Sequence, residues 1–147
     1  MVVRVATLAD VPALFAVRTS VRENHLDLAQ LAERGVTFES VTAGIDSAAS
    51  RTWVAEEGGR VCGFCIADGE SGSISALFVS PDFEGRGCGR RLLQTAEDWL
   101  AAAGFREIWL QTGQEPDNRA HGFYRAAGWR MTGPADHGDV RYEKSLS

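Results

Sequence analysis

The sequence predicts one α/β domain, of the α+β kind, in which helices pack on a single sheet. Two observations carry this prediction. Segments with apolar residues at alternate positions are mixed along the chain with segments whose apolar residues recur at helical spacing. The length of 147 residues is enough for one domain but short for two, and no linker or low-complexity tract divides it. We therefore assign residues 1–147 to a single domain.

The N-terminal third is expected to hold one strand and then three helices. The segment VVRVAT alternates as a half-buried strand does. The next three segments show helical spacing, each with a polar capping residue or a glycine at one end. The expected elements are a strand over residues 2–7 and helices over residues 8–21, 26–35 and 38–45.

From residue 51 onward, β-rich segments predominate and two helices interrupt them. RTWVAEEGGRVCGFCIAD is typical of a hairpin around the turn EEGG, and GSISALFVS is typical of a strand that Pro81 ends. The clearest helix has one apolar stripe and is closed by Gly104. The expected elements are a hairpin over residues 51–68, strands over 72–80, 105–112, 129–133 and 139–146, and helices over 89–103 and 118–127.

The composition disfavours several classes of function. The formal net charge is −5 with no block of like charge, which argues against nucleic acid because phosphates attract basic surfaces. No apolar run is long enough to span a membrane, and MVVRVATLAD lacks the basic start and apolar block of a signal peptide. We therefore expect a cytoplasmic protein with no nucleic-acid or membrane partner, whose mildly acidic surface suits a cationic one.

Cys62 and Cys65 form a C-x-x-C pair, which can indicate redox chemistry or zinc. The surrounding RVCGFCIA is predicted to be a strand, and an odd spacing on a strand places two side chains on opposite faces. A structural zinc site needs about four ligands, and the sequence has no second pair. We therefore expect no metal site and assign both cysteines to core or half-buried positions.

The stretch VSPDFEGRGCGRRLL places three glycines between a predicted strand and a predicted helix. In front of a helix, glycines let successive N–H groups point at one anion, which the helix dipole also attracts. Gly85, Gly87 and Gly89 therefore predict a phosphate site, to which Arg86, Arg90 and Arg91 add positive charge. The spacing fits neither a kinase-type P-loop nor the dinucleotide fingerprint G-x-G-x-x-G, which disfavours a nucleotide-dependent oxidoreductase.

Two segments together resemble the signatures of the GNAT family of N-acetyltransferases. SISALFVSPDFEGRGCGRRLL is similar to the family's acetyl-CoA motif, Gln/Arg-x-x-Gly-x-Gly/Ala after a strand, with Glu84 at its head. DNRAHGFYRAAGW is similar to the second signature, N-x-R-A-x-x-F-Y-x-x-x-G-F, with Asp117 in place of its Asn and Asn118 one position later. The separation of the two segments and the order of the elements also match the family.

The resemblance implies a central mixed, mostly antiparallel sheet of about six to seven strands flanked by about four helices. It also implies acetyl-CoA as the cofactor, with the pantetheine arm on the strand LFVS and the pyrophosphate on the glycine stretch. We expect Glu84 to point outward and Cys88 to pack passively, although the helix dipole favours a lower pKa for the Cys88 thiol. The implied cofactor-binding residues are Leu77, Phe78, Val79, Gly85, Arg86, Gly87, Cys88, Gly89, Arg90 and Asn118.

The implied reaction is direct attack of a primary amine on the thioester of acetyl-CoA in a ternary complex. The resemblance implies the main-chain N–H of Val79 as the oxyanion donor and Tyr124 as the catalytic acid. On the predicted helix, Phe123 is expected to face the core and Tyr124 the cleft. An unshifted phenol is a weaker acid than a thiol by roughly 2 kcal/mol, so Tyr124 acts more by hydrogen-bonding the leaving sulfur than by full proton transfer.

No motif specifies the acceptor or the general base. The N-terminal helices shape the acceptor site in this family, which points to Glu23 and Asn24 as substrate residues. Relatives often carry a glutamate where this chain has Ser73, which is no base at neutral pH. The base is left unassigned, and the alternatives are Glu23, His25, Glu39, Glu70 and a water chain. His121 is expected to be exposed rather than catalytic.

Two functions stay open on the sequence. The first is an acetyl-CoA-dependent N-acetyltransferase whose acceptor is a small cationic amine or a protein amine. The second is a non-catalytic domain that binds acyl-CoA as a sensor or scaffold. Product formation with any amine separates them. Homodimers are common in the family, so a homodimer is a further expectation.

Overall fold

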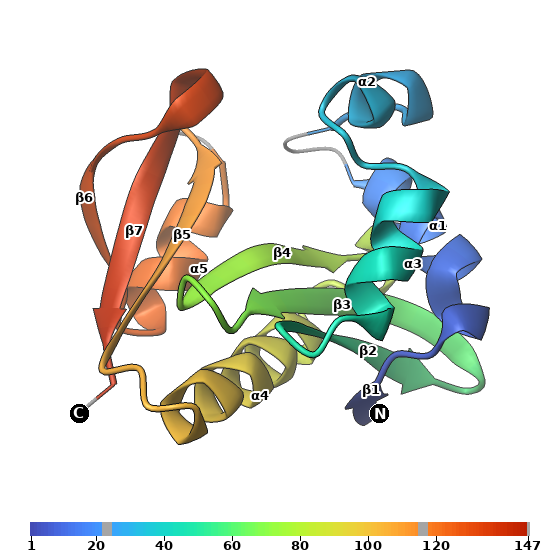
Figure 1. The fold of residues 1–147 in the computed structure, drawn as a ribbon, viewed down its shortest axis with the longest axis horizontal. Helices are drawn as coiled ribbons and strands as arrows, with labels where there is room; N and C mark the ends of the chain where they lie inside the picture. Colours follow the sequence, from blue (N-terminus) through green and yellow to red (C-terminus); the bar gives the residue numbers. More distant parts are fainter. Residues whose placement is uncertain (22–24, 115–117, 147) are drawn as a thin grey trace.

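The computed structural model describes residues 1–21, 25–114 and 118–146, which form a seven-stranded sheet with helices on both faces (Figure 1). The strands are β1 (Val2–Val5), β2 (Ser50–Glu57), β3 (Arg60–Asp68), β4 (Ser73–Val79), β5 (Glu107–Gly113), β6 (Arg130–Pro134) and β7 (Asp139–Ser145). Their order in the sheet is β1-β2-β3-β4-β5-β7-β6. Only β4 and β5 are parallel neighbours, so the expected mixed, mostly antiparallel sheet is confirmed.

Helices cover both faces of the β1–β4 half of the sheet. They are α1 (Val11–Ser20), α2 (Leu28–Glu33), α3 (Phe38–Asp46), α4 (Cys88–Ala102) and α5 (Ala120–Ala126), five in the described chain where about four were expected. Helix α4 packs across β2, β3 and β4 on one face, and α1 and α3 contact β3 and β2 on the other (Figure 1). Across the three described stretches, no helix combines the length and hydropathy that crossing a bilayer requires.

Strands β4 and β5 separate soon after they meet. Their parallel pairing consists of one register position, Ser73 opposite Trp109. The register of β4 against β3 also shifts between the pairs of Ile74 and Ala76, which makes a bulge in β4. The sheet therefore opens between its β1–β4 half and its β5–β7–β6 half, and Figure 1 shows the two halves diverging.

The cysteines of the C-x-x-C pair lie in the main core, and one of the two predictions about them is wrong. Both are buried free thiols, as the core assignment requires. Both belong to the cluster beneath α4, however, instead of lying on opposite faces. Ala55 pairs with Gly63 but the next residue of β2 pairs with Val61, so Cys62 is the extra residue of a β-bulge. The bulge interrupts the strand alternation and turns Cys62 to the same face as Cys65.

A partly buried ion pair joins α4 to the C-terminal half of the sheet. Glu97 of α4, which is 4% exposed, accepts hydrogen bonds from Lys144 Nζ at 2.7 Å and Trp129 Nε1 at 3.2 Å. Lys144 Nζ also donates to the carbonyl oxygen of Ala127 at 2.7 Å, at the end of α5. Each polar group in this set has a hydrogen-bond partner on another element. These contacts therefore hold α4, α5 and β7 in one arrangement around the opening between β4 and β5.

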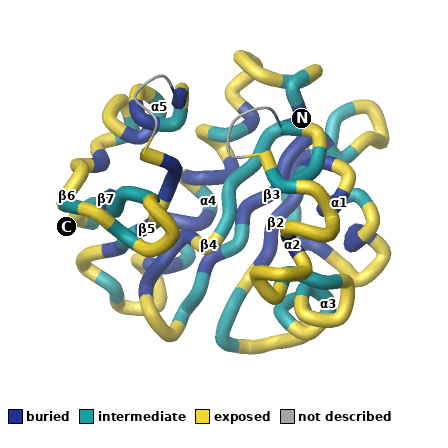
Figure 2. Tube along the Cα trace, turned by 90° about the horizontal axis from the view of Figure 1, so that it is seen from above, coloured by how far each residue is buried: buried dark blue, intermediate teal, exposed yellow. Residues whose placement is uncertain are grey.

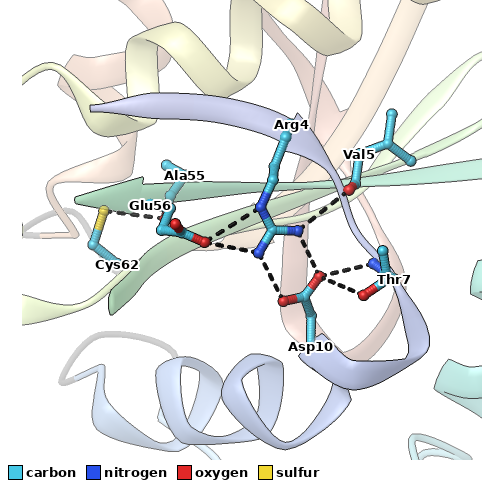
Figure 3. Close-up of polar contacts among 7 residues, drawn as sticks. All are labelled: Arg4, Val5, Thr7, Asp10, Ala55, Glu56 and Cys62. Atoms are coloured by element: carbon cyan, nitrogen blue, oxygen red, sulfur yellow. Dashed lines mark hydrogen bonds and ion pairs between the residues drawn. The ribbon is translucent and has the colours of Figure 1, made fainter. Parts of the chain in front are cut away.

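A second polar network closes the N-terminal edge (Figure 3). Arg4 of β1 donates to both carboxylate oxygens of Asp10, at 2.8 and 3.0 Å, and to Glu56 of β2 at 2.8 Å. Asp10 also accepts the backbone N–H of Thr7 at 2.7 Å, just before α1. The Arg4 hydrogen bond, and to a smaller degree that of Thr7, hold the pKa of Asp10 below its usual value against the opposing effect of burial. The carboxylate thus ties β1, β2 and the start of α1 together.

The lowered pKa of Asp10 predicts an acid-dependent loss of stability. A carboxyl whose pKa is lower in the folded state stabilises the fold above its unfolded pKa of about 3.9, and this contribution disappears as the pH falls through the folded value. We expect the free energy of unfolding in urea to fall more steeply from pH 6 to pH 3 in the wild type than in Asp10→Asn. Asp98→Asn, at an exposed position of α4, should keep the wild-type slope. Equal slopes for all three proteins would contradict the role of Asp10.

Candidate active site

A cleft of about 1210 Å³ opens where β4 and β5 separate. Its walls come from α1 and the α2 region on one side, and from the ends of β5 and α5 and the β6–β7 connection on the other. Strand β4, much of which is of intermediate burial (Figure 2), and the loop that leads into α4 line the cleft between these walls. Two segments that the sequence singled out, residues 77–90 and 118–124, therefore meet in one cavity.

The glycine stretch forms an open backbone loop at the start of α4. Gly85 and Gly87 have φ angles of +75° and +82°, which side chains strongly disfavour, and a Cβ at either position would meet nothing within 4 Å. Gly87 is the N-cap of α4, which begins at Cys88. The N–H groups of this helix end and the bare glycine backbone form a cradle that lines the cleft, and such an arrangement is able to bind an anion.

The charged residues around the cradle are arranged differently from the sequence-based expectation. Glu84 is exposed, as expected, but it also lines the cleft and forms a two-pronged ion pair with Arg119, with N–O distances of 2.9 and 2.9 Å. Arg86 lies over the ring of Phe83 and reaches Glu57 at 3.4 Å. Arg90 lines the cleft. Arg119 therefore neutralises the acid at the head of the cradle.

The β5-facing edge of β4 presents backbone groups to the cleft. The N–H of Ser80 donates to the carbonyl oxygen of Cys62 on β3 at 2.8 Å. Because the N–H groups of an antiparallel strand alternate in direction, those of Leu77 and Val79 point away from β3, toward the space that β5 leaves. Leu77, Phe78 and Val79 all line the cleft, so this edge is able to pair with an extended ligand.

Tyr124 lines the cleft as expected, and Phe123 lines it as well while packing against the core that it was expected to face. Tyr124 is the more buried of the two, at 7% exposed, and its ring packs against Trp129 and Tyr142 at centroid distances of 5.9 and 5.8 Å. Phe123 is only partly buried. Burial raises the pKa of Tyr124 above its ordinary value. Its hydroxyl forms no hydrogen bond with the residues that the structure describes. It can therefore donate a hydrogen bond to a group bound in the cleft.

Helix α5 brings two further polar side chains inward. Asn118 is buried and lines the cleft; its side-chain oxygen accepts the N–H of Ala120 at 3.0 Å. Its Nδ2 is buried without a hydrogen-bond partner among the described residues, which leaves a donor for a bound molecule. His121 is buried, contrary to expectation, because its Nδ1 bonds the Tyr142 hydroxyl at 2.7 Å inside the core.

Few of the described residues that the sequence indicated for the acceptor site or the general base line the cleft. Glu23, Asn24 and Asp117 lie outside the described residues. His25 lines the cleft, whereas Ser73 is buried and shares a hydrogen bond with the Ser71 hydroxyl at 2.8 Å. Glu39 and Glu70 are exposed and lie outside the cleft lining.

Sequence analysis assigned no role to two arginines in this cavity, Arg18 and Arg34. A signal for Arg18 was available, since it follows Leu14 at helical spacing on the apolar stripe of α1. A charged residue on an apolar helix face often has a specific task. Arg34, at the exposed end of a short helix, carried no such signal.

Cys88 packs into the core below the cradle. It is 1% exposed, and its Sγ lies 3.7 Å from Cys62 Sγ. Burial, and then the neighbouring Cys62, raise the pKa of the Cys88 thiol to about 12. The expected lowering by the helix dipole is therefore wrong, while the passive packing role agrees with the structure.

The sequence is similar to those of known acetyltransferases. The protein-family model described as "Acetyltransferase (GNAT) family" matches residues 18–129. An IAA acetyltransferase from Azospirillum brasilense is 38% identical over 88 residues, 57% of either chain. An aminoglycoside N(6')-acetyltransferase type 1 from Stenotrophomonas maltophilia is 36% identical over 61 residues, which cover 42% of this chain and 39% of that protein. The matches thus span little more than half of these relatives at most.

The fold has close counterparts among solved structures. The PaiA N-acetyltransferase from Thermoplasma acidophilum, solved in complex with coenzyme A, superposes with a TM-score of 0.84 at 16% identity, covering 99% of this chain and 100% of that one. The ribosomal-protein-alanine N-acetyltransferase from Brucella melitensis superposes with a TM-score of 0.77 at 22% identity, over 99% and 100% of the two chains. At these identities the likeness establishes the fold alone.

Burial predicts the behaviour of the thiols. Because Cys62, Cys65 and Cys88 are at most 1% exposed and the thiolate is the reactive form, we expect almost no labelling of the folded protein by Ellman's reagent at pH 8. Unfolding in urea should release all three thiols. Rapid labelling of one thiol in the folded protein, absent from Cys88→Ser, would contradict the buried position of Cys88.

Proposed function

Because the chain belongs to the acetyltransferase (GNAT) family, we propose that it transfers an acetyl group from acetyl-CoA to a primary amine bound in the same cleft. One observation carries the proposal: the anion cradle at α4 and the β5-facing edge of β4 open into a single cavity. A cradle alone would suit many phosphates. A cradle continuous with a free strand edge suits a ligand with a phosphate at one end and an extended amide-containing arm at the other.

The residues of the cleft fit acetyl-CoA. The N–H groups around Gly85, Gly87 and Cys88 would hold the pyrophosphate, with Arg90 adding charge. The backbone of β4 at residues 77–79 would pair with the pantetheine amides. The buried Nδ2 of Asn118, which has no partner in the described chain, supports the fit because a ligand carbonyl or phosphate oxygen would satisfy it.

The chemistry follows from what the cleft holds in place. When bound, acetyl-CoA supplies a thioester: the amine forms the new C–N bond, the C–S bond breaks, and the proton that the amine loses balances the thiol product. Holding both reactants in one cavity removes much of the entropic barrier. The N–H of Val79, directed away from β3, would donate to the acetyl oxygen as negative charge develops there.

Tyr124 would act at the leaving sulfur as a hydrogen-bond donor. Burial raises its pKa, so full transfer of its proton to a thiolate is unfavourable. A phenol that stays protonated can still stabilise the developing thiolate charge through a hydrogen bond. The buried ring contacts with Trp129 and Tyr142 restrict the position of the ring, which favours this role over proton shuttling.

Binding of acetyl-CoA is the first prediction of the proposal. Calorimetric titration should give a dissociation constant on the order of 1 µM, or about −8 kcal/mol, for acetyl-CoA and for desulfo-CoA alike. Arg90→Gln should weaken binding about tenfold, since a hydrogen bond to a charged group contributes about 1.5–3 kcal/mol. Arg91→Gln is the matched control, because the neighbouring Arg91 donates to the carbonyl oxygen of Met1 at 2.8 Å instead. If the wild type bound neither acetyl-CoA nor desulfo-CoA, the proposal would be contradicted.

The second prediction concerns Tyr124. Tyr124→Phe should lower kcat at least tenfold, corresponding to about 1.4 kcal/mol, and leave the affinity for acetyl-CoA unchanged. Tyr142→Phe is a matched control, because its hydroxyl bonds His121 in the core and does not line the cleft. Thiol release measured at saturating amine separates the two variants. An unchanged kcat in Tyr124→Phe would exclude the role at the leaving sulfur.

A further inference from the structure

The glycine cradle has a carboxylate at its head. Glu84 directly precedes Gly85, the first glycine of the loop, and it lines the same cleft. A phosphate held by the N–H groups around Gly85, Gly87 and Cys88 would therefore lie near this acid. Because like charges repel, an uncompensated carboxylate at this position would oppose the binding of a phosphate ligand. The loop thus needs a cation that acts on Glu84.

That cation comes from α5, 35 residues further along the chain. Arg119, the N-cap residue of α5, donates from Nη1 and Nη2 to the two carboxylate oxygens of Glu84, at 2.9 and 2.9 Å. A two-pronged pair of this kind fixes the orientation of both groups and also neutralises their charge. Arg119 lines the cleft as well, so a ligand would meet a neutral pair instead of a bare carboxylate.

Two other ion pairs involve this loop, and both lie outside the cleft. Asp82 contacts Arg60 at 3.3 Å, and Arg86 contacts Glu57 at 3.4 Å. None of these four residues belongs to the described lining of the cleft. Of the acids in these three pairs, Glu84 is therefore the one whose charge a ligand in the cleft would meet.

The exposure of the pair decides what it can contribute. The side chains of Arg119 and Glu84 are 64% and 38% exposed, and ion pairs that water and salt screen in this way add little to the stability of a fold. A ligand changes this balance, because a pyrophosphate brings several negative charges into the cleft beside the carboxylate. The pair therefore has a larger effect on ligand binding than on folding.

We propose that Arg119 is a positioning residue for the cofactor, which lets the cradle bind the pyrophosphate of acetyl-CoA by holding and neutralising Glu84. This inference rests on the proposed function, which supplies the ligand. In the alternative, Arg119 leaves Glu84 and binds the phosphate directly. The structure favours the first arrangement, because both terminal nitrogens of Arg119 already donate to the carboxylate.

A double-variant cycle tests the two arrangements. Coenzyme A is titrated calorimetrically into the wild type, Arg119→Gln, Glu84→Gln and the double variant. Arg119→Gln should raise the Kd about five- to tenfold, because it leaves the carboxylate uncompensated, and the double variant should return to within about twofold of the wild type. Glu84→Gln should bind at least as tightly as the wild type. An equal loss from Arg119→Gln with Glu84 present or replaced would overturn the proposal.

Arg60→Gln is the matched control, because Arg60 pairs with Asp82 of the same loop at a similar exposure, 60%, and does not line the cleft. Its Kd should equal that of the wild type. Salt gives a second readout that a damaged helix start would not move. The ratio of the Kd of Arg119→Gln to that of the wild type should shrink from about 0.1 M to about 1 M salt, as the Debye length falls from about 10 Å to about 3 Å. A ratio that salt leaves unchanged would contradict the proposal.

Inorganic pyrophosphate separates failure of this inference from failure of the proposed function. It carries the anion without the rest of the cofactor, so the rise in Tm that it causes reports on the cradle alone. If coenzyme A binds, the four titrations decide. If it does not, the proposed function is contradicted and pyrophosphate decides: a smaller rise in Tm for Arg119→Gln than for the wild type and the double variant supports the proposal. An equal rise in all variants, or none in any, would then overturn it.

Discussion

Separation of β4 from β5 is the constraint on which the rest of the structure depends. If β4 and β5 stayed paired beyond Ser73 and Trp109, the backbone groups of β4 would form hydrogen bonds with β5, and no cleft would open. The bulge in β4 and the bend away from β5 expose one edge of β4 instead. An exposed strand edge in a protein interior needs a partner, and an extended ligand is such a partner. The two halves of the sheet then become the two walls of a cavity.

Holding this opening in shape requires connections between the halves. Glu97 provides one, since its buried carboxylate joins α4 to Lys144 of β7 and to Trp129 after α5. Glu84 and Arg119 provide another at the cradle, where the loop before α4 meets the start of α5. In the first pair the Glu97 carboxylate is buried and loses its compensation if Lys144 is removed, whereas the second pair is exposed at both partners. The two halves of the sheet are thus connected both beneath α4 and at the start of α5.

The cradle depends on packing beneath it as much as on its glycines. Cys88 lies against Cys62, and a Cβ at Gly63 would come within 2.9 Å of the Cys88 sulfur. The first turn of α4 therefore sits directly on the bulge of β3, which sets the direction of its free N–H groups. The raised pKa keeps the Cys88 thiol neutral, and a neutral sulfur can be buried at little cost. Cys88 is therefore suited to packing.

Local patterns in the sequence determined the elements, the glycine cradle and the family. Apolar periodicity placed every strand and α-helix of the described chain, and the order of the elements needs no long-range information. What only the tertiary structure decided were the side-chain directions that depend on contacts distant in sequence. A bulge set by pairing with β2 turned Cys62 to the face of Cys65, and packing against β7 buried Tyr124. Local sequence specifies the period of an element, but the neighbours that it meets decide which side chains reach the site.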